Sequence, residues 1–185
     1  MTKKELRKYI RNLRKSLSPD ERHLKSTEIA ERLFSLDVYQ EAKAIMAYAS
    51  YGSEVETSLI ISKAMSDGKM VSLPKVEGDF MLFIENNENI KLAPGYANIP
   101  EPEDGDIFDP EKFEGSILML MPGVGFDPDR NRIGQGGGFY DRFLATHKNI
   151  KTVAVSFDCQ IVEHIITEAT DMKPDFIVTE SRVIS

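Results

Sequence analysis

The first seventeen positions carry apolar residues at the spacing of an amphipathic helix. At about 100° per residue, one face is formed by Leu6, Ile10, Leu13 and Leu17. A basic stripe lies directly beside that face and is formed by Lys3, Arg7, Arg11 and Arg14. We expect the apolar face to pack on the body and the stripe to point into a cleft. The alternative is a solvated amphipathic helix.

A second helix is expected to start within the segment Ser18-Pro-Asp-Glu21. Serine is a favoured N-cap, proline suits the first helical position, and Glu21 completes a capping box with Ser18. The apolar spacing indicates that this helix ends at about Phe34.

From residue 44 onward, short apolar runs alternate with helical patterns. We expect strands over 44–49, 70–74, 80–84, 117–121, 152–157 and 176–179, and helices over 57–66 and 139–147. This rhythm favours an α/β fold with a mostly parallel sheet and right-handed crossovers. The 80–84 run is expected to form a hairpin with its predecessor across residues 77–79, which makes the sheet mixed.

Residues 93–110 are rich in proline, glycine and acidic side chains. We expect an ordered surface loop there, because its prolines restrict the backbone while Tyr96 and Ile99 can pack. Such a loop could act as a lid.

Length and composition indicate one globular domain that spans residues 1–185. The chain is 41% hydrophobic and 29% charged. Its single cysteine, Cys159, cannot form an internal disulfide, and we assign it no chemistry. The three histidines show no metal-ligand spacing. Because there is no membrane-length apolar run, we expect a cytoplasmic protein.

The charge of the chain is unevenly distributed. Residues 1–15 contain seven lysines and arginines against Glu5 alone, a net charge of +6. Because the whole chain carries −7, the remainder carries −13. General nucleic-acid binders spread positive charge along a face or groove, so this pattern argues against that class and favours local capture of an anion.

The segment from residue 121 to residue 141 is rich in glycine and lies between an expected strand and an expected helix. Glycines let backbone N–H groups turn toward an anion, and a helix N-terminus adds partial positive charge. Arg132 could pair with phosphate oxygens, and Asp141 could hold Mg²⁺. The alternative is an ordered loop whose glycines only make turns. The segment matches neither a Walker A motif nor a dinucleotide fingerprint.

Glu54 lies where an expected strand gives way to a helix, the place at which open α/β sheets bind ligands. Its carboxylate could bind amino or ring N–H groups of a substrate, or could serve only as a cap or surface charge. Glu56 is better explained as a residue near a helix cap at Thr57.

Several separate motifs, taken together, resemble one family. The motifs are Lys3-Lys-Glu-Leu-Arg7, Gly52-Ser-Glu-Val-Glu-Thr57, Ile99-Pro-Glu-Pro102, and Pro122-Gly-Val-Gly-Phe-Asp127 leading into Asn131-Arg-Ile-Gly-Gln-Gly-Gly-Gly-Phe-Tyr-Asp-Arg142. In this order they resemble the 5-formyltetrahydrofolate cyclo-ligase (5,10-methenyltetrahydrofolate synthetase) family across nearly the whole chain.

The resemblance implies an α/β/α sandwich and an ATP- and Mg²⁺-dependent ring closure. In that reaction 5-formyltetrahydrofolate becomes 5,10-methenyltetrahydrofolate, with release of ADP and phosphate. The family's chemistry transfers the γ-phosphoryl group to the formyl oxygen, after which N10 attacks the formyl carbon. The implied partners are the folate and ATP, with no nucleic acid and no membrane, and we expect a monomer.

Residue roles carry over at the matching positions. The implied ATP contacts are Lys3, Lys4, Glu5, Leu6, Arg7, Arg132, Ile133, Gly134, Gln135, Gly136, Gly137, Gly138, Phe139 and Tyr140. The implied folate contacts are Ala49, Glu54, Gln135, Gly136, Gly137, Gly138 and Phe139. Arg132 and Asp141 would be catalytic, and Asp141 and Asp171 would serve magnesium. Residues 96–98, Gln135 and Phe139 depart from the common pattern, which leaves the preferred glutamate-tail length open.

Two other classes remain open at this point. Sugar-phosphate isomerases and CoA transferases can share an α/β sandwich with glycine loops at strand ends, and fold alone does not decide function. A non-catalytic sensor of folate or nucleotide would bind both ligands without turnover.

Overall fold

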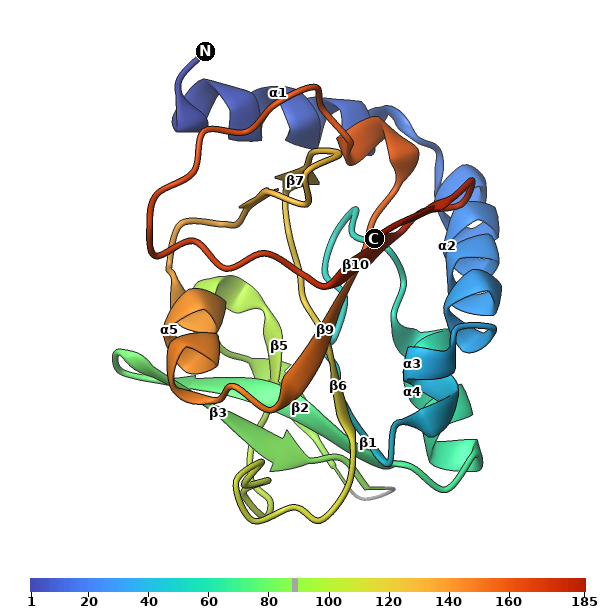
Figure 1. Cartoon of the computed structure of the whole chain (residues 1–185), viewed down its shortest axis with the longest axis vertical. Coiled ribbons are helices and arrows are strands. Elements are labelled where there is room, and N and C mark those ends of the chain that lie inside the picture. Colours follow the sequence, from blue (N-terminus) through green and yellow to red (C-terminus); the bar gives the residue numbers. More distant parts are fainter. Residues whose placement is uncertain (88–89) are drawn as a thin grey trace.

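The central sheet has seven strands and is mostly parallel (Figure 1). The computed structural model describes residues 1–87 and 90–185. The five inner strands run parallel, and an antiparallel strand closes each edge, so the prediction of a mixed α/β sheet is confirmed. In spatial order the strands are β11 (Val183–Ile184), β10 (Phe176–Val178), β9 (Ile150–Val155), β6 (Ile117–Leu120), β1 (Ala44–Met46), β2 (Met70–Glu77) and β3 (Phe80–Glu85).

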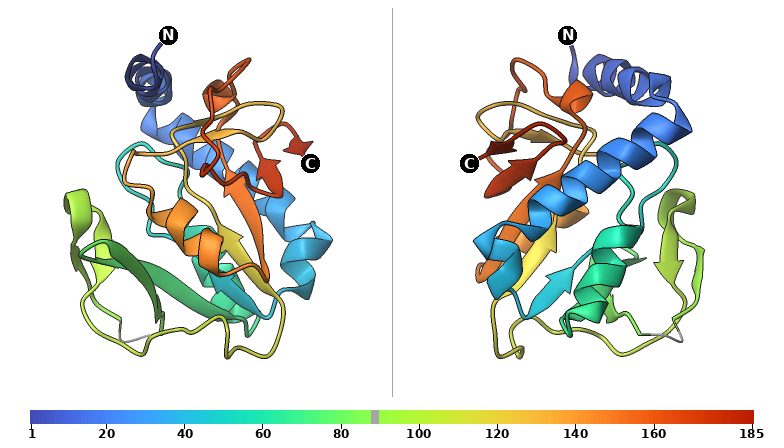
Figure 2. Two further views of the ribbon diagram at one scale, coloured as in Figure 1. Left: turned by 60° about the vertical axis from the view of Figure 1, so that its left-hand side comes forward. Right: turned by 90° about the vertical axis from the view of Figure 1, so that its right-hand side faces the viewer.

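Helices cover both faces of the sheet and give three layers (Figure 2). Successive strand residues point to opposite faces, so Ile45 joins one core and Met46 joins the other. The first face is covered by α2 (Pro19–Phe34), α3 (Asp37–Glu41) and α4 (Ser58–Ser66), and the opposite face by α5 (Phe139–Thr146).

The predicted start of the second helix is confirmed in its atomic detail. Ser18 Oγ accepts from the Glu21 N–H at 3.2 Å, while the Glu21 carboxylate accepts from the Ser18 N–H at 2.8 Å. The expected cap position is confirmed, because Thr57 is the N-cap residue of α4, but its hydroxyl makes no capping hydrogen bond. The hydroxyl instead donates to Tyr48 O at 2.5 Å and accepts from the Ser50 N–H at 3.1 Å. Thr57 therefore closes the 48–57 segment on itself.

Two short hairpins lie outside the central sheet, and the sequence pattern did not predict either. The expected surface loop at 93–110 contains β4 (Leu92–Pro94) and β5 (Pro100–Pro102), joined by the 3₁₀ turn η1 (Tyr96–Asn98). This hairpin is anchored by the buried Glu101, whose carboxylate accepts from the Val76 and Tyr96 N–H groups, each at 3.2 Å. The second hairpin pairs β7 (Gly125–Phe126) with β8 (Arg132–Ile133).

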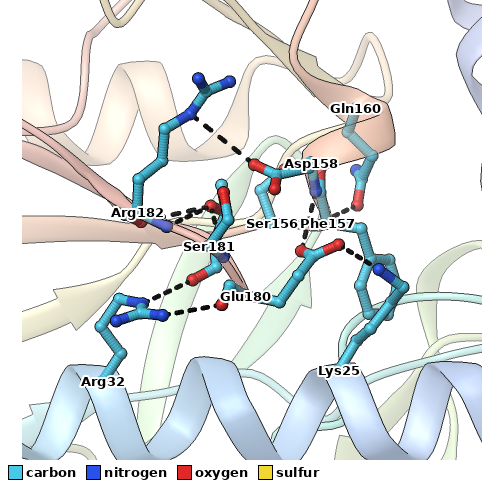
Figure 3. A network of polar contacts seen from close by, with 10 residues as sticks. Lys25, Arg32, Ser156, Phe157, Asp158, Gln160, Glu180, Ser181 and Arg182 are labelled. Atoms are coloured by element: carbon cyan, nitrogen blue, oxygen red, sulfur yellow. Dashed lines mark hydrogen bonds and ion pairs between the residues drawn. The ribbon is translucent and has the colours of Figure 1, made fainter.

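A polar cluster around Glu180 fastens α2 to the far end of the chain (Figure 3). The Glu180 carboxylate pairs with Lys25 Nζ at 2.6 Å and accepts from the Asp158 N–H at 2.9 Å. Arg32 donates to the Thr179 and Glu180 carbonyls. Asp158 begins the 3₁₀ turn η2 (Asp158–Gln160), which packs against α1 (Lys3–Ser16), so this cluster supports the helix that carries the basic stripe.

The chain reverses its direction of progress across the sheet between β1 and β6. β1 leads through α4 to β2 on one side, and β6 leads through α5 to β9 on the other. Ligands bind open α/β sheets at the carboxyl ends of strands beside such a switch point. α1 lies across this end of the sheet, near β7 (Figure 1). Among the described residues, no helix has the length and apolar character needed to cross a bilayer.

Candidate functional site

A cavity of about 730 Å³ opens at this switch point. Its walls come from α1, the segment after β1, strand β2, the β4–β5 hairpin, residues 122–142 and residues 168–172. Tyr48 and Ala49 follow β1, whereas Pro122 and Gly123 follow β6, so both strands end at the cavity. The segments that the sequence singled out therefore meet in one place.

The basic stripe contributes two cavity residues, Lys3 and Arg7. Lys3 Nζ pairs with Glu168 at 2.9 Å and with Asp171 at 3.0 Å. The hydrogen bond to Glu168 raises the pKa of Lys3 against the lowering effect of burial, and Asp171 raises it further. Arg7 Nε donates to Gly134 O at 2.8 Å. Lys3 and Arg7 thereby tie α1 to two different walls.

The other predicted contacts on α1 lie away from the cavity lining. Lys4 and Glu5 are exposed, and Glu5 forms the helix-capping box with Thr2. Leu6 packs against a small apolar cluster centred on Ile10. Side chains that share one face of a helix recur every three or four residues, so a contiguous run of five residues cannot all point into the cavity.

The glycine-rich segment forms a cradle at the start of α5. Gly136 and Gly138 have φ values of +111° and +67°, which side chains rarely adopt. A Cβ at Gly134 would lie 2.8 Å from Arg132 Nη1. Gly138 is the N-cap of α5 and supplies no capping side chain, so the first N–H groups of this helix are not capped by its N-cap residue. Uncapped N–H groups beside a cavity suit an anion.

Arg132 and Asp141 form an ion pair with an N–O distance of 2.7 Å. Arg132 is only 8% exposed, and its Nη1 also donates to Pro122 O at 3.0 Å. Asp141 Oδ1 accepts a second hydrogen bond from the Met172 N–H at 2.9 Å. Arg132 Nε is buried without a hydrogen-bond partner in the described part of the chain. The guanidinium is thus held rigidly and still has an unsatisfied donor.

The two predicted metal-binding carboxylates, Asp141 and Asp171, both line the cavity. Burial raises the pKa of Asp171, but the Glu168 N–H and Lys3 hold it below its ordinary value, so Asp171 is ionised near neutral pH. Each aspartate uses one oxygen for its hydrogen bonds. Within residues 1–87 and 90–185, no group of three or more histidine, cysteine, aspartate or glutamate side chains could hold a metal.

Glu54 faces a different part of the same cavity, together with two tyrosines. Burial raises its pKa, although the Tyr51 N–H, which donates to Glu54 Oε2 at 3.0 Å, and the charge of Arg14 oppose this effect. The pKa values of Tyr48 and Tyr140 lie above the ordinary range because of burial and, next, the charge of Glu54. Both tyrosines are therefore neutral hydroxyl groups available for hydrogen bonds.

An aromatic pair forms the wall beyond the glycines. The Tyr96 ring meets Phe139 edge to face, with a centroid distance of 5.0 Å. The Arg142 guanidinium lies over the Phe139 ring, 4.9 Å from its centroid, and donates a hydrogen bond to Gly137 O. Ile133 and Gln135 line the same cavity. The predicted contacts from Arg132 to Tyr140 are thus all brought together.

The sequence reasoning missed several residues that build this site. Glu101 lies inside the Ile99-Pro-Glu-Pro102 motif, which could have pointed to it. Arg142 is one residue beyond Asp141, on the first turn after the glycines. Tyr48 was hidden inside an expected strand, because the pattern extended β1 to residue 49 whereas the strand ends at Met46.

Comparison with known proteins agrees with this arrangement. Residues 1–180 match the model of the 5-formyltetrahydrofolate cyclo-ligase family. The 5-formyltetrahydrofolate cyclo-ligase of Mus musculus is 32% identical over 96% of this chain and 93% of its own length. That of Escherichia coli (strain K12) is 30% identical over 94% and 98%.

A solved structure is similar over nearly the full chain. The NMR structure of Aquifex aeolicus 5,10-methenyltetrahydrofolate synthetase has a TM-score of 0.83 and 32% sequence identity. The match covers 99% of this chain and 92% of that protein. The fold, the motifs and the family model lead to one conclusion: the chain belongs to the 5-formyltetrahydrofolate cyclo-ligase family.

Proposed function

We propose that this protein converts 5-formyltetrahydrofolate to 5,10-methenyltetrahydrofolate in a reaction that requires ATP and Mg²⁺. The observation that carries the proposal is that one cavity joins a cationic, glycine-lined end to a region with Glu54 and aromatic side chains. Family membership supplies the substrate class.

The triphosphate fits the glycine-lined end. The positive-φ glycines leave room for close backbone approach, and the start of α5 adds partial positive charge. Lys3, Arg7 and Arg132 supply full positive charges around it. Anions need charged and N–H donors at close range, and this end of the cavity offers both.

Asp141 and Asp171 would hold the magnesium, because both line the cavity and the second carboxylate oxygen of each makes no hydrogen bond within the described residues. Mg²⁺ is commonly held by one or two carboxylates plus phosphate oxygens and water, so a larger protein cluster is not required. When bound there it would neutralise phosphate charge.

The folate fits the remaining space. The Glu54 carboxylate can accept hydrogen bonds from N–H groups of the reduced pterin, and the Tyr48 and Tyr140 hydroxyls lie beside it. Phe139 and Tyr96 offer an apolar wall for the aromatic part of the substrate.

When ATP is bound, transfer of its γ-phosphoryl group from ADP to the formyl oxygen would make that oxygen a leaving group. N10 would then bond to the formyl carbon and release its proton, and the bond from that carbon to the phosphorylated oxygen would break with release of phosphate. The chain itself needs no covalent nucleophile. Its contribution is position and charge: Arg132 and the 134–138 amides lie where phosphate charge must be neutralised, and Glu54 orients the ring.

A spectroscopic assay tests the proposal directly. Absorbance in the methenyl product band is recorded with 5-formyltetrahydrofolate and Mg·ATP, then with ATP omitted, and then with Mg²⁺ chelated. Product should accumulate only in the complete mixture. An absorbance increase without ATP, or no increase with both ligands bound, would refute the proposal. The second result would favour a non-catalytic sensor of folate or nucleotide. Ribose 5-phosphate should not be isomerised, which tests the alternative of a sugar-phosphate isomerase.

A monomeric state and a cytoplasmic location stay predictions.

A further inference from the structure

Three arginines on one face of α1 contact different segments at or beside the cavity. Arg7, Arg11 and Arg14 follow at the i, i+4 and i+7 spacing of a single helix face. Arg7 Nε donates to Gly134 O, and Arg11 Nη2 donates to the Gln135 side chain. Arg14 Nε donates to Ser53 Oγ at 3.1 Å, next to Glu54. One helix therefore contacts both the glycine cradle and the Glu54 segment.

Arg14 differs from its two neighbours because it is buried. It is 6% exposed, does not line the cavity and forms no ion pair within the described residues. Burial lowers the pKa of Arg14, and Glu54 gives the largest opposing contribution. A buried guanidinium is costly unless an opposite charge compensates it. The opposite charges of Arg14 and Glu54 compensate each other, and Arg14 is hydrogen-bonded to Ser53, the residue that precedes Glu54.

The surroundings of Glu54 define what Arg14 can do. Two cations of α1 face it, Arg11 and Arg14, together with the Gln135 side chain from the glycine cradle. Tyr48 and Tyr140 also interact with it, and both are neutral. Burial raises the pKa of Glu54; the Tyr51 N–H opposes this rise most, followed by Arg14, the Gln135 side chain and Arg11. Of the two cations, Arg14 contributes more.

We propose that Arg14 is a positioning residue that keeps Glu54 ionised and directed into the cavity, through Ser53 and through its charge. This inference rests on the proposed folate contact of Glu54. A carboxylate accepts hydrogen bonds from ring N–H groups with both oxygens, whereas a protonated carboxyl loses part of that capacity. Arg14 thus determines the affinity for the folate without touching it.

The alternative is that Arg14 only stabilises the fold. A positioning role and a structural role both predict some loss of stability when Arg14 is replaced, so a melting temperature cannot separate the two hypotheses. They differ in the pH dependence of kcat/KM for the folate and in dependence on Glu54, because a structural arginine has no reason to act through that one carboxylate.

The test compares Arg14→Met, which keeps an unbranched apolar stem but removes the charge, with Arg14→Lys, which keeps the charge. Lys15→Met is the matched control, since Lys15 is an exposed cation on the same helix. In Arg14→Met the folate KM should rise roughly tenfold, with a smaller change in kcat. The acid limb of kcat/KM should move to higher pH, because Glu54 then takes up a proton more readily. Arg14→Lys should largely restore the limb, and Lys15→Met should match wild type.

A double-mutant cycle tests whether Arg14 acts through Glu54. In a Glu54→Gln background, Arg14→Met should add little to the folate KM, whereas independent effects would multiply. If Arg14→Met does not fold, Ser53→Ala replaces it in the same cycle and should raise the folate KM less, with the pH limb nearly unmoved. An unshifted acid limb in Arg14→Met, or multiplying effects in the cycle, would overturn the inference. Wild-type turnover is measured first, so a failure of the proposed function shows separately as no methenyl product from the wild-type protein.

Discussion

Arg132 shows how burial changes an expectation drawn from residue type alone. From the sequence, replacing it by alanine should affect turnover far more than stability. In the structure, its guanidinium holds Asp141 and the Pro122 carbonyl and is nearly enclosed. Breaking a buried pair by removing one partner typically costs about 3–5 kcal/mol. The alanine variant would therefore mix two effects.

A charge-conserving change separates the effects. Arg132→Lys should lower kcat by about 10²–10³, because one ammonium cannot hold Asp141 and also neutralise phosphate as a planar guanidinium can. Turnover is measured at saturating Mg·ATP alongside the melting temperature. Lys151→Met, an exposed cation on β9, is the control. Wild-type turnover in Arg132→Lys would remove Arg132 from the chemistry.

Glu54 yields a prediction of the opposite kind. Glu54→Gln keeps the shape of the side chain and removes an acceptor, so the folate KM should rise while kcat changes little. Steady-state kinetics over a range of folate concentrations, at saturating Mg·ATP, measure both parameters. A collapsed kcat with unchanged KM would instead indicate that Glu54 takes a direct part in the reaction.

At the scale of elements, the position of α1 depends on a glycine of β7. A Cβ at Gly125 would lie 2.3 Å from Ile10 Cδ1 and 3.3 Å from Gln160 O. Ile10 is fully buried and anchors the small cluster that attaches α1 to the body. The absence of a side chain at Gly125 is therefore what lets α1 approach closely enough for Arg7 and Lys3 to reach the cavity.

Gly125→Ala should lower the free energy of unfolding by about 1–3 kcal/mol, the usual range for overpacking, and should raise the KM for ATP because α1 moves away. Adding Ile10→Val removes the Cδ1 atom that the new methyl would meet, so the double variant should recover part of both losses. Urea unfolding and initial rates measure the two quantities. A double variant that is worse than Gly125→Ala would show that α1 is not held by this contact.

The longer helices and the inner strands followed from the sequence because each shows its apolar pattern along its length, whereas α3, with five residues, was not predicted. The helix capped by Ser18 was predicted with its cap and its end, and Phe34 is its last residue. β7 and β8 were not predicted, because strands of two residues are too short for any periodicity.

The motif residues from Arg132 to Tyr140 all line the cavity, but Glu101 and Arg142 were missed although they also lie within motifs. Arg14 was interpreted only as part of a basic stripe, because burial by tertiary packing leaves no mark on a charged residue in the sequence.

At the scale of the whole molecule, five carboxylates among the described residues have a pKa below the ordinary value in the folded protein. The five are Glu5, Glu21, Asp67, Asp109 and Asp171. Each gains hydrogen bonds or ion pairs in the folded protein, and these lower its pKa, whereas burial opposes the lowering. For Asp171, burial is the largest single contribution, but the other contributions together outweigh it. A lowered pKa contributes stability above the unfolded-state pKa and loses it as the pH falls through the folded-state pKa. Glu54 is opposite in sign, because its raised pKa favours the folded state at acid pH.

Because the five outnumber Glu54, we expect the urea midpoint to be nearly constant above about pH 5 and to fall as the pH drops below about 4. The midpoint is measured from pH 7 to pH 3 at constant ionic strength. Glu54→Gln is a useful comparison, since it should steepen the loss slightly. A midpoint that rises toward pH 3 would show that buried acids such as Glu54 dominate instead.

The bond from Lys3 to Asp171 joins residues 168 positions apart. On the ribosome, a nascent chain emerges from its amino end at about 5–20 residues per second, so Asp171 becomes available to Lys3 long after α1 has emerged. Until then α1 lacks one of its attachments. Translation intermediates that end before residue 171 should therefore bind nucleotide poorly, and binding should improve once that residue has left the exit tunnel.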